Sequence, residues 1–221
     1  MSKNSESYQF VPKDGDGWDV KRDSIAHVAL FTSQGDTSHI ASIDPGMQLA
    51  ELASHYIRAA NTLISVALED TKFLDVHALP TCFLYRHGLE LLLKDLAWRS
   101  HYLVTGEKIF SKENWGNLGQ HRLSSIWNKA KVSAKKAFNR DFPLTSNEVV
   151  EVESCLSDIE KYDSDSFAFR YPFDKQSKRT HPELTNINLA IFRDKINQTV
   201  YHIASILDMI DYYISANQDA R

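Results

Sequence analysis

The chain has few cysteines, no long apolar run and no leader pattern. Cys82 and Cys155 are its two cysteines, and they share no Cys-x-x-Cys spacing, so we expect reduced thiols and no disulfide. Apolar runs such as LELLL are broken by charge within a turn or two, far short of the roughly 20 residues that span a membrane. The start, MSKNSESYQF, lacks the basic and then apolar pattern of a signal peptide. We therefore expect a cytoplasmic protein without a membrane segment.

Short motifs typical of metal and cofactor sites are missing as well. The nine histidines form no His-x-x-x-His or His-Glu-x-x-His pattern, and none has a cysteine at a ligand spacing. A zinc site normally needs such clustered ligands. We expect no structural or catalytic metal ion and no cofactor.

The composition is that of an ordinary globular protein. Hydrophobic residues make up 43% and charged residues 24% of 221 positions, enough for one large core. The first part of the chain differs, because it holds glycine, serine and aspartate without a sustained helical period. We expect residues 1–44 to form an irregular arm, with a strand-like run at 25–31, and residues 45–221 to form one domain.

Beyond residue 44, apolar side chains recur every three to four positions, which is the period of an α-helix. Asp44 and Pro45 suit the start of the first helix, and Thr145 with Glu148 has the spacing of a capping box. The second helix is apolar all round and should be central. An all-α, antiparallel bundle of about five helices follows. The predicted helices cover residues 45–69, 80–104, 121–138, 145–161 and 186–215.

The net charge of −4 hides an asymmetry along the sequence. Residues 114–140 contain basic side chains and no acidic one, and an acidic stretch, residues 148–165, follows. The basic side chains either face those acids, form a solvated helix face, or bind RNA phosphates without sequence preference. The candidate nucleic-acid contacts, with one added from a later loop, are Arg122, Lys129, Lys131, Lys135, Lys136, Arg140 and Lys175.

Charges also occur within the most apolar helix. Arg86, Glu90 and Lys94 follow at intervals of four and form one stripe, with His87 beside it. An unpaired buried charge costs several kcal/mol, so these groups are either paired or used. One interpretation is a structural ion network, and the other is a cleft lined by Arg86 and His87.

A second charged patch surrounds Arg170. The residue before a proline is held extended, so Pro172 fixes where Tyr171 and its neighbour Arg170 point. Arg170 then either closes onto Glu90 as a structural clamp or binds a phosphate. We assign Tyr171 and Asp174 to the ion network around this turn.

His121 stands at the predicted start of a helix. There it either caps free backbone N–H groups or is a titratable group at the positive end of the helix dipole. We favour the capping role.

The order of these pieces resembles that of HEPN domains. The similar pieces are Glu90-Leu-Leu-Leu-Lys94 in an apolar helix, Gly119-Gln-His-Arg-Leu123 at the start of the next, and Phe169-Arg-Tyr-Pro172 after the fourth. The resemblance covers roughly residues 50 to 215. It implies a cytoplasmic homodimer of bacterial defence or toxin–antitoxin type, with RNA and an antitoxin or neighbouring-gene protein as partners.

Many HEPN proteins cleave RNA with an Arg-x4-6-His pair, in which Arg stabilises phosphate charge and His moves the proton. The final helix here lacks that pair, so a metal-independent ribonuclease would use other groups. The alternative is a non-catalytic helical module that binds a protein partner, with the isoleucine-rich face of the last helix as a dimer seam. The catalytic candidates are Arg170, His87, Arg86 and His121.

Overall fold

The computed structural model describes residues 41, 42, 44, 47–106, 121–138, 141–180 and 183–219, with side chains to residue 216. By its contacts the chain divides into two units, residues 1–45 and 46–221. The strand-like run at 25–31 and the candidate Arg140 lie outside the described residues.

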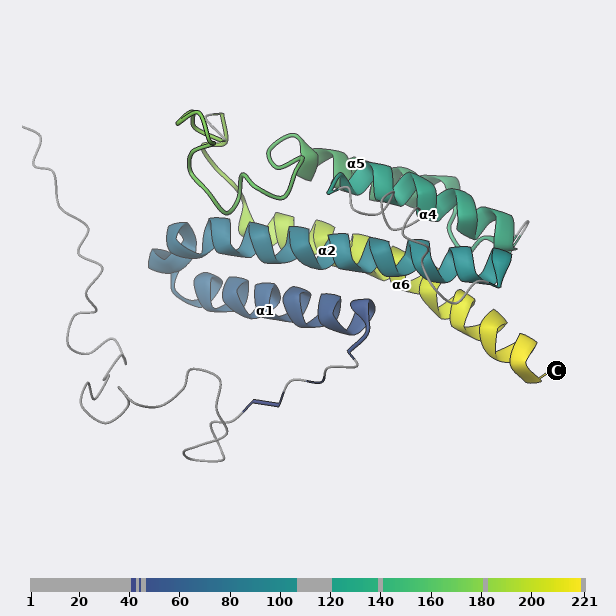
Figure 1. Ribbon diagram of the computed structural model, residues 1–221. Coiled ribbons are helices and arrows are strands. Elements are labelled where there is room, and N and C mark those ends of the chain that lie inside the picture. Colours follow the sequence, from purple (N-terminus) through teal and green to yellow (C-terminus); the bar gives the residue numbers. More distant parts are fainter. Residues whose placement is uncertain are drawn as a thin grey trace, which may run out of the picture. The chain divides into compact units, whose positions relative to one another are not determined.

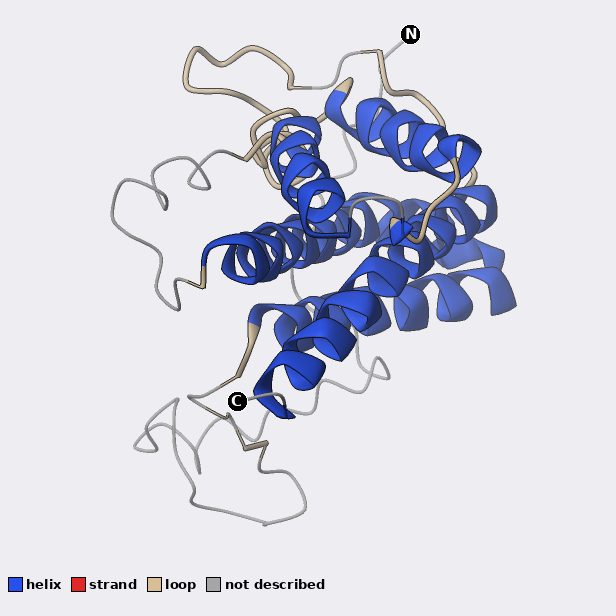
Figure 2. Ribbon diagram, turned by 90° about the vertical axis from the view of Figure 1, so that its right-hand side faces the viewer, coloured by secondary structure: helices blue, strands red, loops and turns tan. Residues whose placement is uncertain are grey.

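The second unit is all-helical, which confirms the predicted fold class. Within the described ranges it contains no strand, only an isolated antiparallel bridge between Phe173 and Arg179 (Figure 2). The elements are α1 (Leu49–Glu69), the 3₁₀ turn η2 (Thr71–Phe73), α2 (Leu74–Thr105), α4 (Leu123–Phe138), α5 (Ser146–Glu160) and α6 (Leu189–Asp219).

Helix α2 is the central element, as its apolar sequence predicted. It packs against α1, α4 and α6 (Figure 1). Tyr85, Leu89, Leu93 and Leu96 are fully buried along it, and Trp127 of α4 is the largest fully buried side chain among the described residues. Burial on several faces explains how one helix can place polar groups such as Arg86 deep in the core.

Gly88 sets the close approach of α1 to α2. A Cβ at this position would lie 2.8 Å from Cγ1 of Ile57 and 3.2 Å from the carbonyl oxygen of Ala53. Both contacts are shorter than ordinary van der Waals distance, so glycine is the residue that fits here.

Two helix starts differ from the prediction. Helix α1 begins at Leu49, after Gln48, which makes no side-chain cap hydrogen bond, so the Asp44-Pro45 start was placed too early. Helix α2 begins at Leu74, and Pro80 lies inside it. As the seventh residue of the helix, Pro80 lacks the amide that would bond to the Val76 carbonyl and crowds that carbonyl, which costs about 3 kcal/mol, and the rest of the structure must offset this cost.

The other boundaries agree more closely with the sequence. Thr145 and Glu148 form the predicted capping box: the Glu148 amide donates to the Thr145 hydroxyl, and the Thr145 amide donates to the Glu148 carboxylate. Helix α4 ends at Phe138 as expected and begins two residues after His121.

The isoleucine-rich face of α6 belongs to the core. Ile196, Ile203, Leu207 and Ile210 are buried against the bundle. A dimer seam on this face was therefore a wrong prediction, because these side chains already fill the interior.

Cys82 and Cys155 are both buried and unpaired, which confirms two free thiols. Burial raises the pKa of the Cys82 thiol to about 12. No helix in the part of the chain described here has the length and apolar character needed to cross a bilayer.

Candidate functional site

Arg86 of α2 is the centre of a buried polar network. Its guanidinium is fully buried and lies 2.7 Å from the carboxylate of Glu90. Its Nε donates to the carbonyl of Asp163 at 3.1 Å, and its Nη2 donates to the carbonyls of His121 at 2.6 Å and Ser164 at 3.4 Å. Because no surface of Arg86 is open to a substrate, its role is structural and it leaves the catalytic candidates.

Glu90 holds three partners at once. Besides Arg86, Lys94 Nζ donates to its Oε1 at 2.7 Å, and the Nδ1 of His121 lies 2.9 Å from the same oxygen. Burial alone would raise the pKa of Glu90, but the hydrogen bonds from Lys94, Arg86 and His121 outweigh it and hold the pKa below its usual value. The predicted i,i+4 pairing of Glu90 with both cations is confirmed.

His121 is the exposed member of this network. Its side chain keeps 54% of its surface open although Nδ1 contacts the buried Glu90. It does not cap α4: the amide and hydroxyl of Ser124 bond instead to the carboxylate of Glu160. The capping interpretation of His121 was wrong, and the ring is anchored at one nitrogen by a carboxylate.

Asp163 shapes the loop that follows α5. One oxygen of its buried carboxylate accepts from the amides of Phe167 at 2.7 Å and Ala168 at 3.0 Å. The other lies 3.4 Å from Nε of Arg86. The turn that carries Arg170 is thus tied to α2 by a contact that local spacing could not reveal.

Arg170 is exposed and lies against aromatic rings. Its guanidinium lies 5.6 Å from the ring centres of both Phe83 and Tyr171, and it donates to the carbonyl of Ser166. No contact joins it to Glu90, so the predicted clamp was wrong, and Arg86 fills that position instead.

His87 lies half-buried between two aromatic rings. Its ring stacks on Phe83 at 5.8 Å and meets the edge of Tyr56 at 4.6 Å. Burial lowers the pKa of His87 below its usual value. Since Phe83 contacts both His87 and Arg170, the structure brings these two candidates to one ring.

Tyr171 and Asp174 are not part of the ion network. Tyr171 stacks on Phe167 with ring centres 4.7 Å apart. The carboxylate of Asp174 accepts from the amides of Gln176 and Lys178 and orders a local turn. The assignment of both residues to the network was wrong.

The basic face of α4 is partly turned toward α5, as one interpretation predicted. Lys131 pairs with Glu153, and the nitrogen of Lys135 lies 5.3 Å from the ring centre of Phe142. Arg122 and Lys136 are exposed. Lys131 is therefore a poor candidate for a phosphate contact, whereas Arg122 adjoins the exposed His121.

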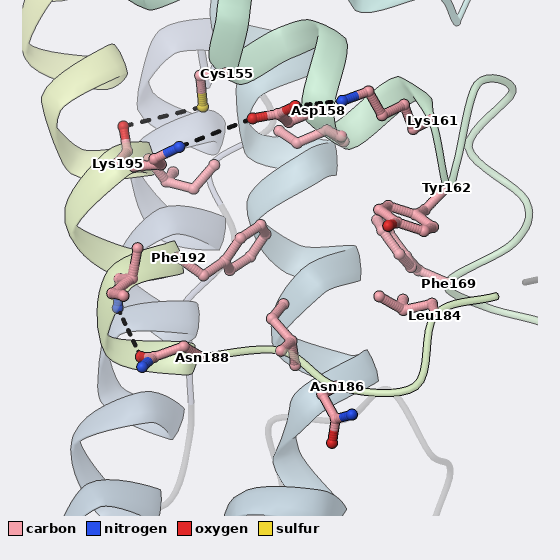
Figure 3. A pocket seen from close by; sticks show the side chains of 14 residues that line it. Cys155, Asp158, Lys161, Tyr162, Phe169, Leu184, Asn186, Asn188, Phe192 and Lys195 are labelled. Atoms are coloured by element: carbon pink, nitrogen blue, oxygen red, sulfur yellow. Dashed lines mark hydrogen bonds and ion pairs between the residues drawn. The ribbon is translucent and has the colours of Figure 1, made fainter.

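An apolar hollow of about 340 Å³ was not foreseen from the sequence. It lies between the end of α5, the following loop and the start of α6, with Phe169, Ile187 and Phe192 among its lining residues (Figure 3). At its rim Asp158 lies 2.8 Å from Lys161 and 3.8 Å from Lys195. No histidine lines this hollow.

A search for metal sites and a comparison with known proteins add no further candidate site. In the described ranges no group of three or more His, Cys, Asp or Glu residues could hold a metal ion. No family model, no curated protein and no solved structure matches this chain.

Proposed function

We propose that this chain is a HEPN-like, RNA-directed protein of bacterial defence or toxin–antitoxin type, cytoplasmic and homodimeric, that cleaves RNA without a metal ion. The observation that carries the proposal is the exposed ring of His121, anchored 2.9 Å from the buried carboxylate of Glu90. A histidine oriented by a fixed carboxylate is the usual arrangement of a general base.

The chemistry follows from which nitrogen is engaged. An ionised Glu90 only accepts hydrogen bonds, so Nδ1 of His121 carries the proton and Nε2 has the free lone pair. Nε2 takes the proton of an RNA 2′-hydroxyl while that oxygen bonds to the adjacent phosphorus. The bond from phosphorus to the 5′-oxygen breaks, and the leaving oxygen receives the proton from His121. The products are a 2′,3′-cyclic phosphate and a 5′-hydroxyl end.

The charge stabilisation falls to Arg122, the exposed residue next to His121 in the chain. Lys94 is 11% exposed and its amine already bonds to Glu90, so it helps to fix that carboxylate. A cation beside the phosphate stabilises the negative charge that grows in the transition state. Arg86 contributes indirectly, because it holds both Glu90 and the main chain of His121.

The test is incubation of the purified protein with total RNA and with tRNA in the presence of EDTA. Wild type should produce fragments ending in cyclic phosphate, and His121→Ala should abolish them. The backbone carbonyl that binds Arg86 survives this substitution, so the fold should be retained. His55→Ala removes an exposed histidine of α1 and should leave cleavage unchanged. Intact RNA with wild type, or equal cleavage by His121→Ala, would refute the proposal.

The second candidate is a non-catalytic helical module that binds a protein partner. The observation in its favour is that Arg86 and Glu90 are sealed by mutual pairing, as a purely structural network would be. Tyr201 and Tyr212 of α6, 66% and 69% exposed, lie about three helical turns apart on one face and suit a contact between subunits. A Tyr201→Ala, Tyr212→Ala double variant that remains dimeric by light scattering would exclude that seam.

A further inference from the structure

The loop after α5 displays aromatic rings at the surface, each beside a cation. Tyr171 is 49% and Phe173 is 48% exposed. The guanidinium of Arg170 lies 5.6 Å from the ring centre of Tyr171, and that of Arg179 lies 5.5 Å from the ring centre of Phe173. Exposed aromatic rings that lie close together in one loop, each with a cation at its face, form a surface that suits flat or charged ligands.

The same loop carries further positive charge. Lys175 and Lys178 are exposed and lie in sequence between Phe173 and Arg179. Of the acidic groups after α5, Asp163 is buried against Arg86 of α2, the exposed Asp165 accepts from the Ser164 hydroxyl, and Asp174 accepts backbone amides. Residues 170–179 themselves combine two exposed rings with four cations and one acid, Asp174.

The rings are held in place before any ligand arrives. Tyr171 stacks on Phe167, its amide donates to the Phe167 carbonyl at 3.2 Å, and its own carbonyl accepts from the Thr180 hydroxyl at 2.7 Å. Phe173 and Arg179 form the isolated bridge of the loop. Since the backbone is fixed by these bonds, little further ordering is needed on binding.

We propose that this aromatic–cation loop, residues 170–179, binds unpaired nucleotides of single-stranded RNA. Bases stack on Tyr171 and Phe173, and Lys175, Lys178 and Arg179 contact the phosphates. The inference rests on the proposed function and names its substrate class. Stacking needs open base faces, which a duplex hides, so single-stranded RNA is the ligand that fits. An apolar peptide would leave the cations beside each ring unpaired.

The buried network links this loop to His121. One nitrogen of Arg86 donates to the carbonyls of both His121 and Ser164, and Ser164 opens the turn that leads to Arg170. An RNA strand whose bases stack on the loop is thus bound by a segment that Arg86 anchors, and Arg86 also anchors His121, the proposed general base.

The test is fluorescence polarisation of the full chain with a labelled, unstructured RNA of about twelve nucleotides, and with the same sequence in a duplex. His121→Ala is the background, so that binding is measured without cleavage. Single-stranded RNA should bind more tightly than the duplex. Tyr171→Leu should weaken it roughly 5- to 150-fold, the range for loss of one stacked base, whereas Tyr171→Phe should bind as wild type.

Because binding is measured in the His121→Ala background, it tests RNA binding by the loop independently of RNA cleavage. Equal affinity of Tyr171→Leu and Tyr171→Phe, or a duplex bound as tightly as the single strand, would overturn the inference. Displacement of the RNA by polyglutamate as effectively as by unlabelled RNA would assign the loop to an acidic protein partner instead. Binding lost in Tyr171→Leu supports the inference even if wild type leaves RNA uncut.

Discussion

In the core of the bundle, Nη2 of Arg86 donates a hydrogen bond to the main-chain carbonyl of His121 at 2.6 Å. The same guanidinium holds Glu90, whose carboxylate in turn contacts the His121 ring. The buried pair of Arg86 and Glu90 therefore fixes both parts of His121: Arg86 binds its backbone carbonyl and Glu90 binds its ring. This arrangement lets an exposed ring keep a defined position, which proton transfer requires.

Arg86→Met should destabilise the protein by roughly 3–5 kcal/mol, because it leaves buried acceptors and Asp163 without their cation. The measurement is urea unfolding followed by circular dichroism. Arg58→Met, at an exposed position of α1, is the matched control and should change stability by less than about 0.5 kcal/mol. Equal unfolding midpoints for the two variants would show that the network contributes nothing to stability.

Stability should fall as the pH drops through the range in which His87 titrates. Burial lowers its pKa in the folded protein below the usual 6.5, and the cations Arg86, Lys94 and Arg170 add to this while Glu90 opposes it. The unfolded chain therefore binds the proton more tightly. The contribution of His87 is complete above about pH 6.5 and is lost as the pH falls through the lowered value.

His87→Phe removes this titration and keeps a ring between Tyr56 and Phe83. Its free energy of unfolding, measured from about pH 7.5 to pH 5, should depend less on pH than that of wild type. The exposed control His55→Gln should retain the wild-type slope. A slope unchanged in His87→Phe would contradict the assignment.

Gly88→Ala should destabilise the bundle by about 1–3 kcal/mol, because the new methyl meets Ile57 at 2.8 Å and the Ala53 carbonyl at 3.2 Å. The higher helix propensity of alanine offsets part of this cost. Removing the Ile57 side chain beyond Cβ should relieve the clash. In a double-mutant cycle with Ile57→Ala, Gly88→Ala should therefore cost less, and strict additivity would argue against the close contact.

Lys175→Ala with Lys178→Ala should reduce the salt dependence of RNA binding. Each phosphate contact to a single strand contributes about −0.7 to the slope of log K against log salt, so losing two should lower its magnitude by about 1.4. Lys131→Ala should leave the slope unchanged, since that amine already pairs with Glu153. If Lys131→Ala lowered this slope more than the Lys175→Ala, Lys178→Ala double variant does, the RNA phosphates would contact α4 instead of the loop.

Local spacing predicted the parts of this network that lie within one helix. Arg86, Glu90 and Lys94 share a stripe at intervals of four, so both pairs with Glu90 could be foreseen. The other partners of Arg86 include the carbonyls of His121 and Asp163, 35 and 77 residues away in sequence. Such contacts depend on how α2, α4 and the loop pack, which no short-range pattern encodes.

The misplaced features have similar causes. Pro80 suits a first helical position, yet packing extends α2 back to Leu74. An apolar stripe on α6 suits either a core or a seam, and only the burial of residues such as Ile203 shows that it is the core. The predicted capping box at Thr145 was correct because its determinants lie within three residues of each other.

Photocrosslinking tests most directly whether RNA binds at His121 and the aromatic–cation loop, as we propose. Single-stranded RNA containing 4-thiouridine would be irradiated with the His121→Ala variant of the chain, and the crosslinked peptides identified by mass spectrometry. Crosslinks should concentrate in residues 162–180 and at the start of α4, and Tyr171→Leu should deplete those in the loop. Crosslinks confined to α1 or to the outer face of α6, or none above background, would contradict the claim.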